Sequence, residues 1–379
     1  MTIVAHAHPF VIGVDTHAKK HALSILAAPV GEVVDNGEFP TTTAGIGRAI
    51  AWAGRRTRGG QDVLWVVECS ATYGAQLANA VRAAGFQVVE AARMSARASR
   101  GVGKSDPLDA RRIAAAVLPL ETSRLRRLRE GQGVRAALRV AIAARDTMSG
   151  ERTAALNTLT ALARVMDLGI DARKPLTTAQ VLEASRWRTR AEDVAAATAR
   201  AEAVRLARRV VELEDDLTEN TKTLTDLLRQ SPARVLLEMP GIGPVTAAVV
   251  MAAWSHPGRL RDEAAFASLA GVNPIPASSG NTVRHRLNRG GDRRLNQALH
   301  MAVVVRMRWD TETKAYVERR TAEGRTKREI RRNLKRYLAR QVFRALTTAS
   351  RTPAPTLTPA TSTCGIGTSA GTVGEPSGF

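Results

Sequence analysis

Short runs of apolar residues separated by polar turns fill the first third of the chain, and their lengths are typical of buried strands. The strand candidates are residues 10–15, 21–28, 32–39, 62–68 and 86–92. The third candidate contains Asn36-Gly37, a dipeptide that favours a turn. Apolar residues at helical spacing occur in the segments 43–56, 72–85 and 106–117. Strands followed by alternating helices and strands predict a mixed α/β domain over residues 1–122.

From residue 123 to residue 229 the pattern is helical, rich in Ala and Arg, and free of strand signals. Its second half carries residues at alternating steps of four and three: Leu206, Val210, Leu213, Leu217, Asn220, Leu224 and Leu227. This heptad-like series favours a coiled coil, within the chain or between chains, in which Asn220 fixes the register. The alternative is an ordinary amphipathic helix that packs on its own domain.

The last third of the sequence divides into a basic region and a tail. Residues 230–347 predict a compact, mostly helical C-terminal domain, so the expected fold class is α/β followed by α. Residues 348–379 are rich in Thr, Pro, Gly and Ser, and we expect this tail to be disordered. No internal repeat is evident.

The charge of the chain narrows the class of partner. Its 379 residues include 56 Lys and Arg against 35 Asp and Glu, a net charge of +21. This surplus indicates a polyanion, most simply nucleic acid; an anionic membrane surface is the alternative, although no apolar run is long enough to span a bilayer. Two distant cysteines, Cys69 and Cys364, provide neither a disulfide framework nor a Cys-based zinc site. His17 and His21 flank the first strand turn and are not favoured as ligands. The N-terminus lacks a signal-peptide pattern, so we expect an intracellular protein.

Four carboxylates stand at the ends of predicted elements. Asp15 ends one apolar run and Glu68 ends another, where an uncompensated charge is costly. Asp106 and Asp109 begin a helix and share one of its faces. Local helix capping by Asp106, with Pro107 at the first helical position, is the simpler explanation of this pair. Together the four acids would suit Mg²⁺, as two ions or with Mn²⁺ in its place, acting on a phosphodiester.

The C-terminal region holds further features suited to nucleic acid. Pro240, Gly241 and Gly243 lie in a tight turn before a small-residue helix, which resembles a helix-hairpin-helix motif; a plain turn between packed helices is the alternative. The helix over residues 325–343 has one face of Arg and Lys, which contacts nucleic acid or is simply solvated. The other residues predicted to contact nucleic acid are Lys104, Gly280, Arg284, Arg286, Arg289, Arg293, Arg294, Arg328, Arg331, Arg332 and Lys335.

The blocks VIGVDTHAKKHALSILA, VVECSATYG and KSDPLDARRIA resemble those of the DEDD-type insertion-sequence transposases, the IS-one-ten family, which includes the pilin-gene invertase. The resemblance covers about residues 9–345. It implies a RuvC-like N-terminal domain with an RNase H fold. It also implies that Asp15, Glu68, Asp106 and Asp109 form a metal-binding tetrad.

The same resemblance gives a role to the Ser-Ser-Gly sequence of the C-terminal domain. A serine hydroxyl is a weak nucleophile until it is activated, and the residues alone do not favour one here. In the family, a serine directly before a glycine is the catalytic nucleophile, which falls on Ser279, with Ser278 as the alternative. The stretch NRGGD at residues 288–292 departs from the usual SKRGD, which weakens the transfer of a DNA contact to Arg289.

The resemblance therefore implies a DNA transposase that cuts and rejoins strands and holds the cut strand covalently. It implies a guide RNA encoded by the element, a dimer or tetramer joined through the coiled coil, and a cytoplasmic, nucleoid-associated location in a prokaryote. One alternative is a RuvC-like junction endonuclease that uses water as its nucleophile. Another is a non-catalytic nucleic-acid-binding protein, against which the four intact acids argue.

Overall fold

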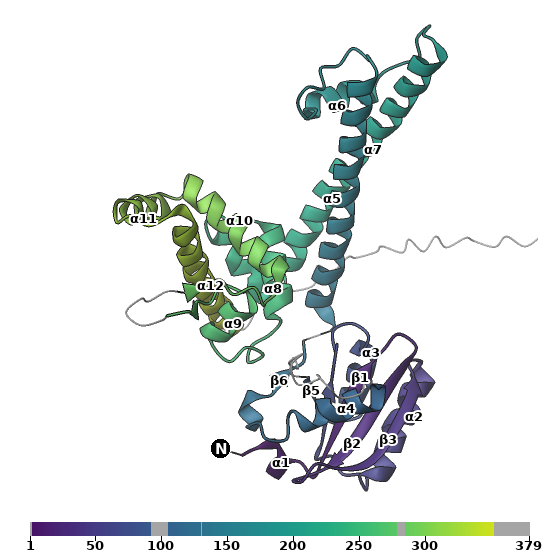
Figure 1. Cartoon of the computed structure of the whole chain (residues 1–379), viewed down its shortest axis with the longest axis vertical. Helices are drawn as coiled ribbons and strands as arrows, with labels where there is room; N and C mark the ends of the chain where they lie inside the picture. Colours follow the sequence, from purple (N-terminus) through teal and green to yellow (C-terminus); the bar gives the residue numbers. More distant parts are fainter. Residues whose placement is uncertain (1, 92–104, 130, 279–284, 352–379) are drawn as a thin grey trace, which may run out of the picture.

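The computed structural model describes residues 2–91, 105–129, 131–278 and 285–351. The chain forms a sheet domain, a long helical stalk and a helical C-terminal part that lies beside the base of the stalk (Figure 1). Mixed α/β structure followed by mostly helical structure confirms the predicted fold class at this level. The predicted disordered tail begins too early, because residues 348–351 complete helix α12. The rest of the tail, from residue 352, lies outside the described residues.

A mixed sheet of six strands in the order β3-β2-β1-β4-β5-β6 forms the N-terminal domain. The strands are β1 (Phe10–Thr16), β2 (Lys20–Ala27), β3 (Glu32–Pro40), β4 (Val63–Val67), β5 (Gln87–Glu90) and β6 (Arg126–Arg127). Strands β1, β4 and β5 are parallel, whereas β2, β3 and β6 pair antiparallel with their neighbours. This arrangement fits an RNase H-like domain. Its last strand lies beyond the predicted boundary at residue 122.

Helices cover both faces of the sheet. Side chains alternate between the two faces along each strand, and apolar residues occupy both faces. The helices are α1 (Val4–Ala7), α2 (Thr43–Arg56), α3 (Ala75–Ala83) and α4 (Asp106–Ala115), followed by the short 3-10 helix η2 (Thr122–Arg124). Ile12 and Val14 pack on the side of α2 and α3. Val11 and Val66 belong to the other side, which α4 covers. Since side chains alternate along a strand, residues two or four positions from Val11 or Val66 on the same strand also lie on the α4 side.

Two local expectations are corrected in this domain. Asn36-Gly37 makes no turn, because β3 continues through it and pairs with Ser24 and Leu23 of β2. A Cβ on Gly37 would lie 2.7 Å from the ring of Phe39, which packs on Trp52, so glycine leaves room for this ring. The helix after residue 105 begins at Asp106, and its N-cap is Ser105 rather than Asp106.

The stalk consists of α5 (Gly133–Val165) and α7 (Val194–Arg229), with α6 (Thr178–Ser185) at its far end (Figure 1). Helices α5 and α7 run antiparallel, since Ala141 contacts Asn220 and Arg152 contacts Glu214. The heptad residues Leu206, Val210, Leu213 and Leu224 are buried. The amide of Asn220 donates to the carbonyl of Ala141, 2.9 Å away, so α7 has a partner helix within its own chain. A coiled coil between chains stays a prediction.

The C-terminal part is built from helices around one apolar core. Its elements are η3 (Pro232–Glu238), α8 (Pro244–Trp254), α9 (Glu263–Leu269), β7 (Ile275–Pro276), β8 (His285–Arg286), α10 (Arg293–Trp309), α11 (Thr311–Ala322) and α12 (Lys327–Arg351). Trp254, Phe266 and Leu299 are fully buried in this core, which also takes in Leu138 of α5 and Leu228 of α7. Among the described helices, none is both long and apolar enough to cross a membrane.

Candidate active site

Helix α4 lies directly on β1 because residue 13 is a glycine. A Cβ on Gly13 would be 2.0 Å from the carbonyl oxygen of Ala110 and 2.7 Å from the amide nitrogen of Ala114. No other residue permits so close an approach between helix and strand. The first turn of α4, with Asp106 and Asp109, is thereby held against the end of β1 where Asp15 lies.

Asp15 and Glu68 come to the same place from the ends of two neighbouring parallel strands. Glu68 follows β4, and its amide donates to the carbonyl of Val14, which continues the pairing with β1. The hydroxyl of Thr16 donates to the carbonyl of Glu68, 3.1 Å away. By strand alternation, Asp15 follows Val11 and Gly13 on the α4 side, and Glu68 follows Val66 there. Both carboxylates therefore belong to the side that α4 covers.

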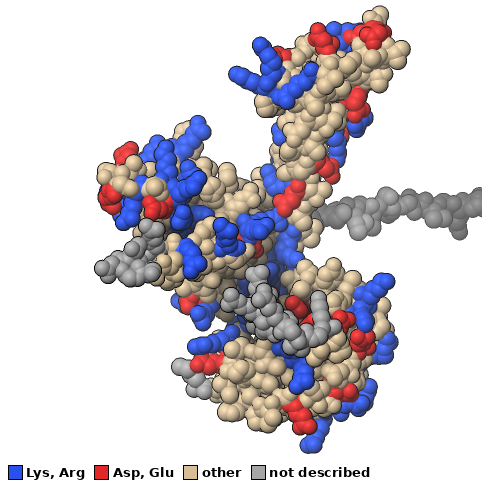
Figure 2. Space-filling view, in the orientation of Figure 1, with Lys and Arg blue, Asp and Glu red and all other residues tan. Residues whose placement is uncertain are grey.

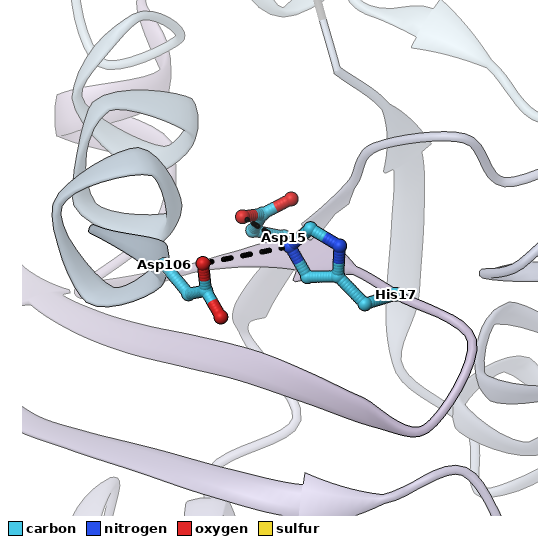
Figure 3. Close-up of side chains that lie close together, drawn as sticks. All are labelled: Asp15, His17 and Asp106. Atoms are coloured by element: carbon cyan, nitrogen blue, oxygen red, sulfur yellow. Dashed lines mark hydrogen bonds and ion pairs between the residues drawn. The ribbon is translucent and has the colours of Figure 1, made fainter. Parts of the chain in front are cut away.

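His17 joins the acids, although the sequence did not favour it as a ligand. Its Nε2 lies 3.1 Å from an oxygen of Asp15 and 3.7 Å from an oxygen of Asp106, as the close-up in Figure 3 shows. One ligand atom from each of these residues lies within 4.8 Å of the others, close enough to hold one metal ion. The missed signal was strand periodicity, since residues 15 and 17 are two apart at the end of one strand.

The electrostatics of the acid cluster favour a cation. Burial raises the pKa of Glu68, and the nearby charges of Asp15 and Asp109 raise it further. Asp109 also accepts a hydrogen bond from Arg112, 3.0 Å away, and Lys20 lies 3.7 Å from Asp106. Crowded carboxylates repel one another, and a hard divalent ion with oxygen ligands relieves this repulsion. The donor set present at this site fits such an ion.

Ser279, Gly280 and Arg284 lie outside the described residues, as does Lys104. The structure does describe Ser278 and the short pair of β7 and β8 that leads into and out of this segment.

The other residues predicted to contact nucleic acid are either exposed to solvent or bonded to other parts of the chain. Arg286, Arg289, Arg293, Arg328 and Arg332 are exposed, and Arg331 is half-buried. Arg294 instead turns to α5, where it donates to Asp146 and to the carbonyl of Ile142. Lys335 donates to Asn296, and burial lowers the pKa of its ammonium group.

The two glycines of the turn before α8 have different surroundings. Gly241 has a φ of +74° and packs on α10, where a Cβ would lie 2.7 Å from the carbonyl oxygen of Ala302. Arg306 donates to the carbonyl of Pro240 from the same helix. Gly243, the N-cap of α8, is exposed and has open space beside it. The Gly243 side of the turn is thus the side open to a ligand.

Comparisons with known proteins cover both parts of the chain. A DEDD-type IS110 family model described as "Transposase" matches residues 12–166, which include the four acids. A second model, "Transposase IS116/IS110/IS902 family", matches residues 233–318. The chain is 27% identical to an uncharacterized 42 kDa protein of insertion element IS900 from Mycobacterium paratuberculosis, over 70% of this chain and 78% of that protein. It is 34% identical over 93 residues, 24% of this chain and 23% of the relative, to an uncharacterized 43.6 kDa protein of insertion element IS110 from Streptomyces coelicolor.

Proposed function

Since the chain belongs to the IS110 (IS-one-ten) family of DEDD-type transposases, enzymes that act on DNA, we propose that it cuts and rejoins DNA strands through a covalent serine intermediate. The observation that carries this proposal is the meeting of Asp15, Glu68 and the first turn of α4 at one edge of the sheet. The acids come from segments far apart in the sequence. Packing alone does not require four carboxylates at one place.

In this proposal, Asp15, Glu68, Asp106 and Asp109 hold divalent metal, Mg²⁺ or Mn²⁺, and His17 orients Asp15 through the contact at 3.1 Å. When bound, such ions activate the attacking hydroxyl and stabilise the leaving oxygen in phosphodiester chemistry. The oxygen of Ser279 would attack phosphorus while the bond from phosphorus to the 3′ oxygen breaks. The serine proton would pass to solvent, and the leaving 3′ oxygen would take up a proton to become a free 3′ hydroxyl. The cut strand then stays joined to the serine through its phosphate until a free 3′ hydroxyl reverses the step.

The proposed division of labour follows the parts of the chain. Residues 1–122 with strand β6 are the catalytic domain, helices α5 to α7 the linking helices, and residues 230–351 the domain of the nucleophile, followed by the predicted tail. The serine acts on the tetrad of the same chain or of a second copy paired through the stalk. A guide RNA encoded by the element selects the DNA by base pairing, and the turn at Pro240–Gly243 and the exposed arginines hold backbone phosphates.

A trapping assay tests the reaction. The purified protein, transcripts of the flanking noncoding region, Mg²⁺ and the circular junction DNA of the element are mixed, and the products are separated on denaturing gels. We expect a covalent protein–DNA adduct in the wild type and none in Ser279→Ala. We expect Asp15→Asn to lose more than about a hundredfold in adduct yield, since even partners outside the metal ligands cost 10–100-fold when removed.

Ser278→Ala is the matched control, because it removes a hydroxyl one position away and should keep the adduct. The adduct should also disappear with EDTA and return with Mn²⁺. Cleavage without an adduct that survives Ser279→Ala would reject the serine and favour a junction endonuclease with water as nucleophile. The absence of any Mg²⁺-dependent product would favour a binding protein without catalysis.

A further inference from the structure

A basic cleft separates the outer edge of the sheet domain from the loop and helix around α9. Its volume is about 800 Å³. Residues from β5, from η2 and β6, and from the segment before α9 line it. In Figure 2, Lys and Arg side chains gather where the C-terminal part faces the sheet domain. From the sequence we predicted no nucleic-acid contact for any arginine of this cleft.

The positive charges of the cleft greatly exceed its negative charges. Its arginines are Arg124, Arg126, Arg127, Arg129, Arg259 and Arg261, and among the described residues Glu90 is the single acid in its lining. Arg124 pairs with Glu121 and Arg261 with Asp262, both at the rim. Within the described residues, no ion pair neutralises the other three arginines from β6 and the segment after it.

Arg259 is the most confined of these cations. Its side chain is 7% exposed, and Nη2 lies 3.5 Å from a carboxylate oxygen of Glu90 across the boundary between the two parts of the chain. Its Nη1 donates to the carbonyl of Ala253. The buried Nε atoms of Arg259 and Arg129 have no hydrogen-bond partner in the described structure. Burial lowers the pKa of Arg259, and the charges of Arg129 and Arg126 lower it further, so the guanidinium groups are close enough to repel one another.

The cleft is next to the acid cluster. Glu90 ends β5 and pairs in register with Val67 of β4, the residue before Glu68. The cleft therefore lies at the strand next to β4, and β4 is the strand that leads into Glu68.

We propose that this cleft binds backbone phosphates of a nucleic-acid strand beside the acid cluster, and that the bound strand bridges the sheet domain and the C-terminal part. Planar guanidinium groups with free N–H donors match phosphate oxygens in charge and geometry. An anion also relieves the repulsion among the arginines, which a single carboxylate does not balance. The proposal rests on the proposed function, because it places a nucleic-acid strand beside the proposed metal-binding tetrad. The phosphates belong to the DNA or to the guide RNA.

Binding without catalysis tests the cleft. The affinity of the full chain for labelled junction DNA and, separately, for the noncoding transcript is measured by fluorescence anisotropy in EDTA over a range of salt. We expect Arg127→Gln with Arg129→Gln to weaken binding of one of the two probes at least about tenfold, as for lost charge-assisted hydrogen bonds. The slope of log K against log salt should become shallower by about one per lost phosphate contact. The probe that responds identifies the strand.

Two further variants keep the test decisive. Arg205→Gln with Arg173→Gln removes the same charge at exposed positions that already have carboxylate partners, and should change affinity less than about threefold. Glu90→Gln removes the repulsive carboxylate and should strengthen binding of the same probe severalfold.

Equal affinities and slopes in the cleft variant and the control for both probes would overturn the proposal. So would a lower melting temperature of the cleft variant with unchanged binding, which indicates a purely structural interface. A lost adduct in the trapping assay with intact cleft binding would instead reject only the proposed reaction.

Discussion

The acid cluster and the arginine cleft are neighbouring regions of opposite charge, and in both of them groups of like charge are crowded together. Glu68 is crowded by other carboxylates, and Arg259 is crowded by other guanidinium groups. In both regions, burial adds to the repulsion and shifts the pKa of the confined group towards its neutral form. Each region is costly in the isolated chain and becomes favourable when an ion of the opposite charge binds.

The two regions differ in how they are assembled. The acids stand at the ends of regular elements that pack within one domain, with α4 held on β1 at Gly13. The arginines come from a two-residue strand, an irregular segment and the loop before α9, and they meet only because the C-terminal part docks on the sheet domain. The comparison indicates that the acid cluster is set by local geometry and the cleft by docking.

Gly13→Ala should break the acid cluster most severely. The added Cβ meets the backbone of α4 at 2.0 Å, so the helix that carries Asp106 must move. We expect a loss of at least about 2 kcal/mol in the free energy of unfolding. We also expect adduct formation to fall by about a hundredfold or more, since displacement of a catalytic group by 1 Å costs that much. Urea unfolding and the trapping assay measure the two effects.

Gly47→Ala is the control for this change. Gly47 lies within α2, and a Cβ there has nothing within 4 Å. Alanine should stabilise the helix by about 0.5–1 kcal/mol and leave the adduct unchanged. If the two alanine variants behave alike, the close approach of α4 to β1 does not position the acids.

Glu68→Gln tests whether a bound cation relieves the repulsion in the acid cluster. Mg²⁺ at a hundred times its Kd should stabilise the wild type by about 2.7 kcal/mol, and most of this gain should disappear in the variant. Without metal, the variant should be more stable at pH 7 by only a few tenths of a kcal/mol, because Glu68 is partly exposed to solvent. Thermal unfolding with EDTA and with Mg²⁺ measures both effects.

The pH dependence gives the same variant an independent test. The pKa of Glu68 is raised in the folded chain, so folding favours the protonated carboxyl. The stability of the metal-free wild type should therefore rise as the pH falls through the folded pKa towards the ordinary value, and the glutamine variant should lack this contribution. An unchanged response to Mg²⁺ in Glu68→Gln would remove Glu68 from the site.

The sequence predicts where Asp15 and Glu68 lie in the fold for physical reasons. Buried strands impose a period of two, so an acid at the end of an apolar run marks the edge of the sheet, as Asp15 and Glu68 do. A helix start with two acids three residues apart is equally local. The sequence did not favour His17, although its position two residues after Asp15 at the end of one strand carried the same period-of-two signal.

Other features depend on tertiary packing and leave no periodic signal. Gly37 matches a turn dipeptide, yet it serves the packing of Phe39 on Trp52 across the sheet. Strand β6 has two residues and is held by pairing with β5 rather than by its composition. Glu90 and Arg259 are far apart in sequence, so only the docked structure brings them to 3.5 Å.

Arg129→Gln should have the smallest effect, and it tests the basic side of the comparison in the isolated chain. The substitution removes one of several mutually repelling cations, and the Nε of Arg129 is buried without a hydrogen-bond partner in the described structure. The free energy of unfolding at low salt should therefore rise by a few tenths of a kcal/mol, and the melting temperature should rise with it. The gain should vanish at about 1 M salt, where charges are screened beyond about 3 Å. Arg124→Gln, which loses a partner in Glu121, should show no gain at either salt concentration. A gain of equal size in both variants, or one that persists at high salt, would mean that the repulsion in the cleft is not what the substitution relieves.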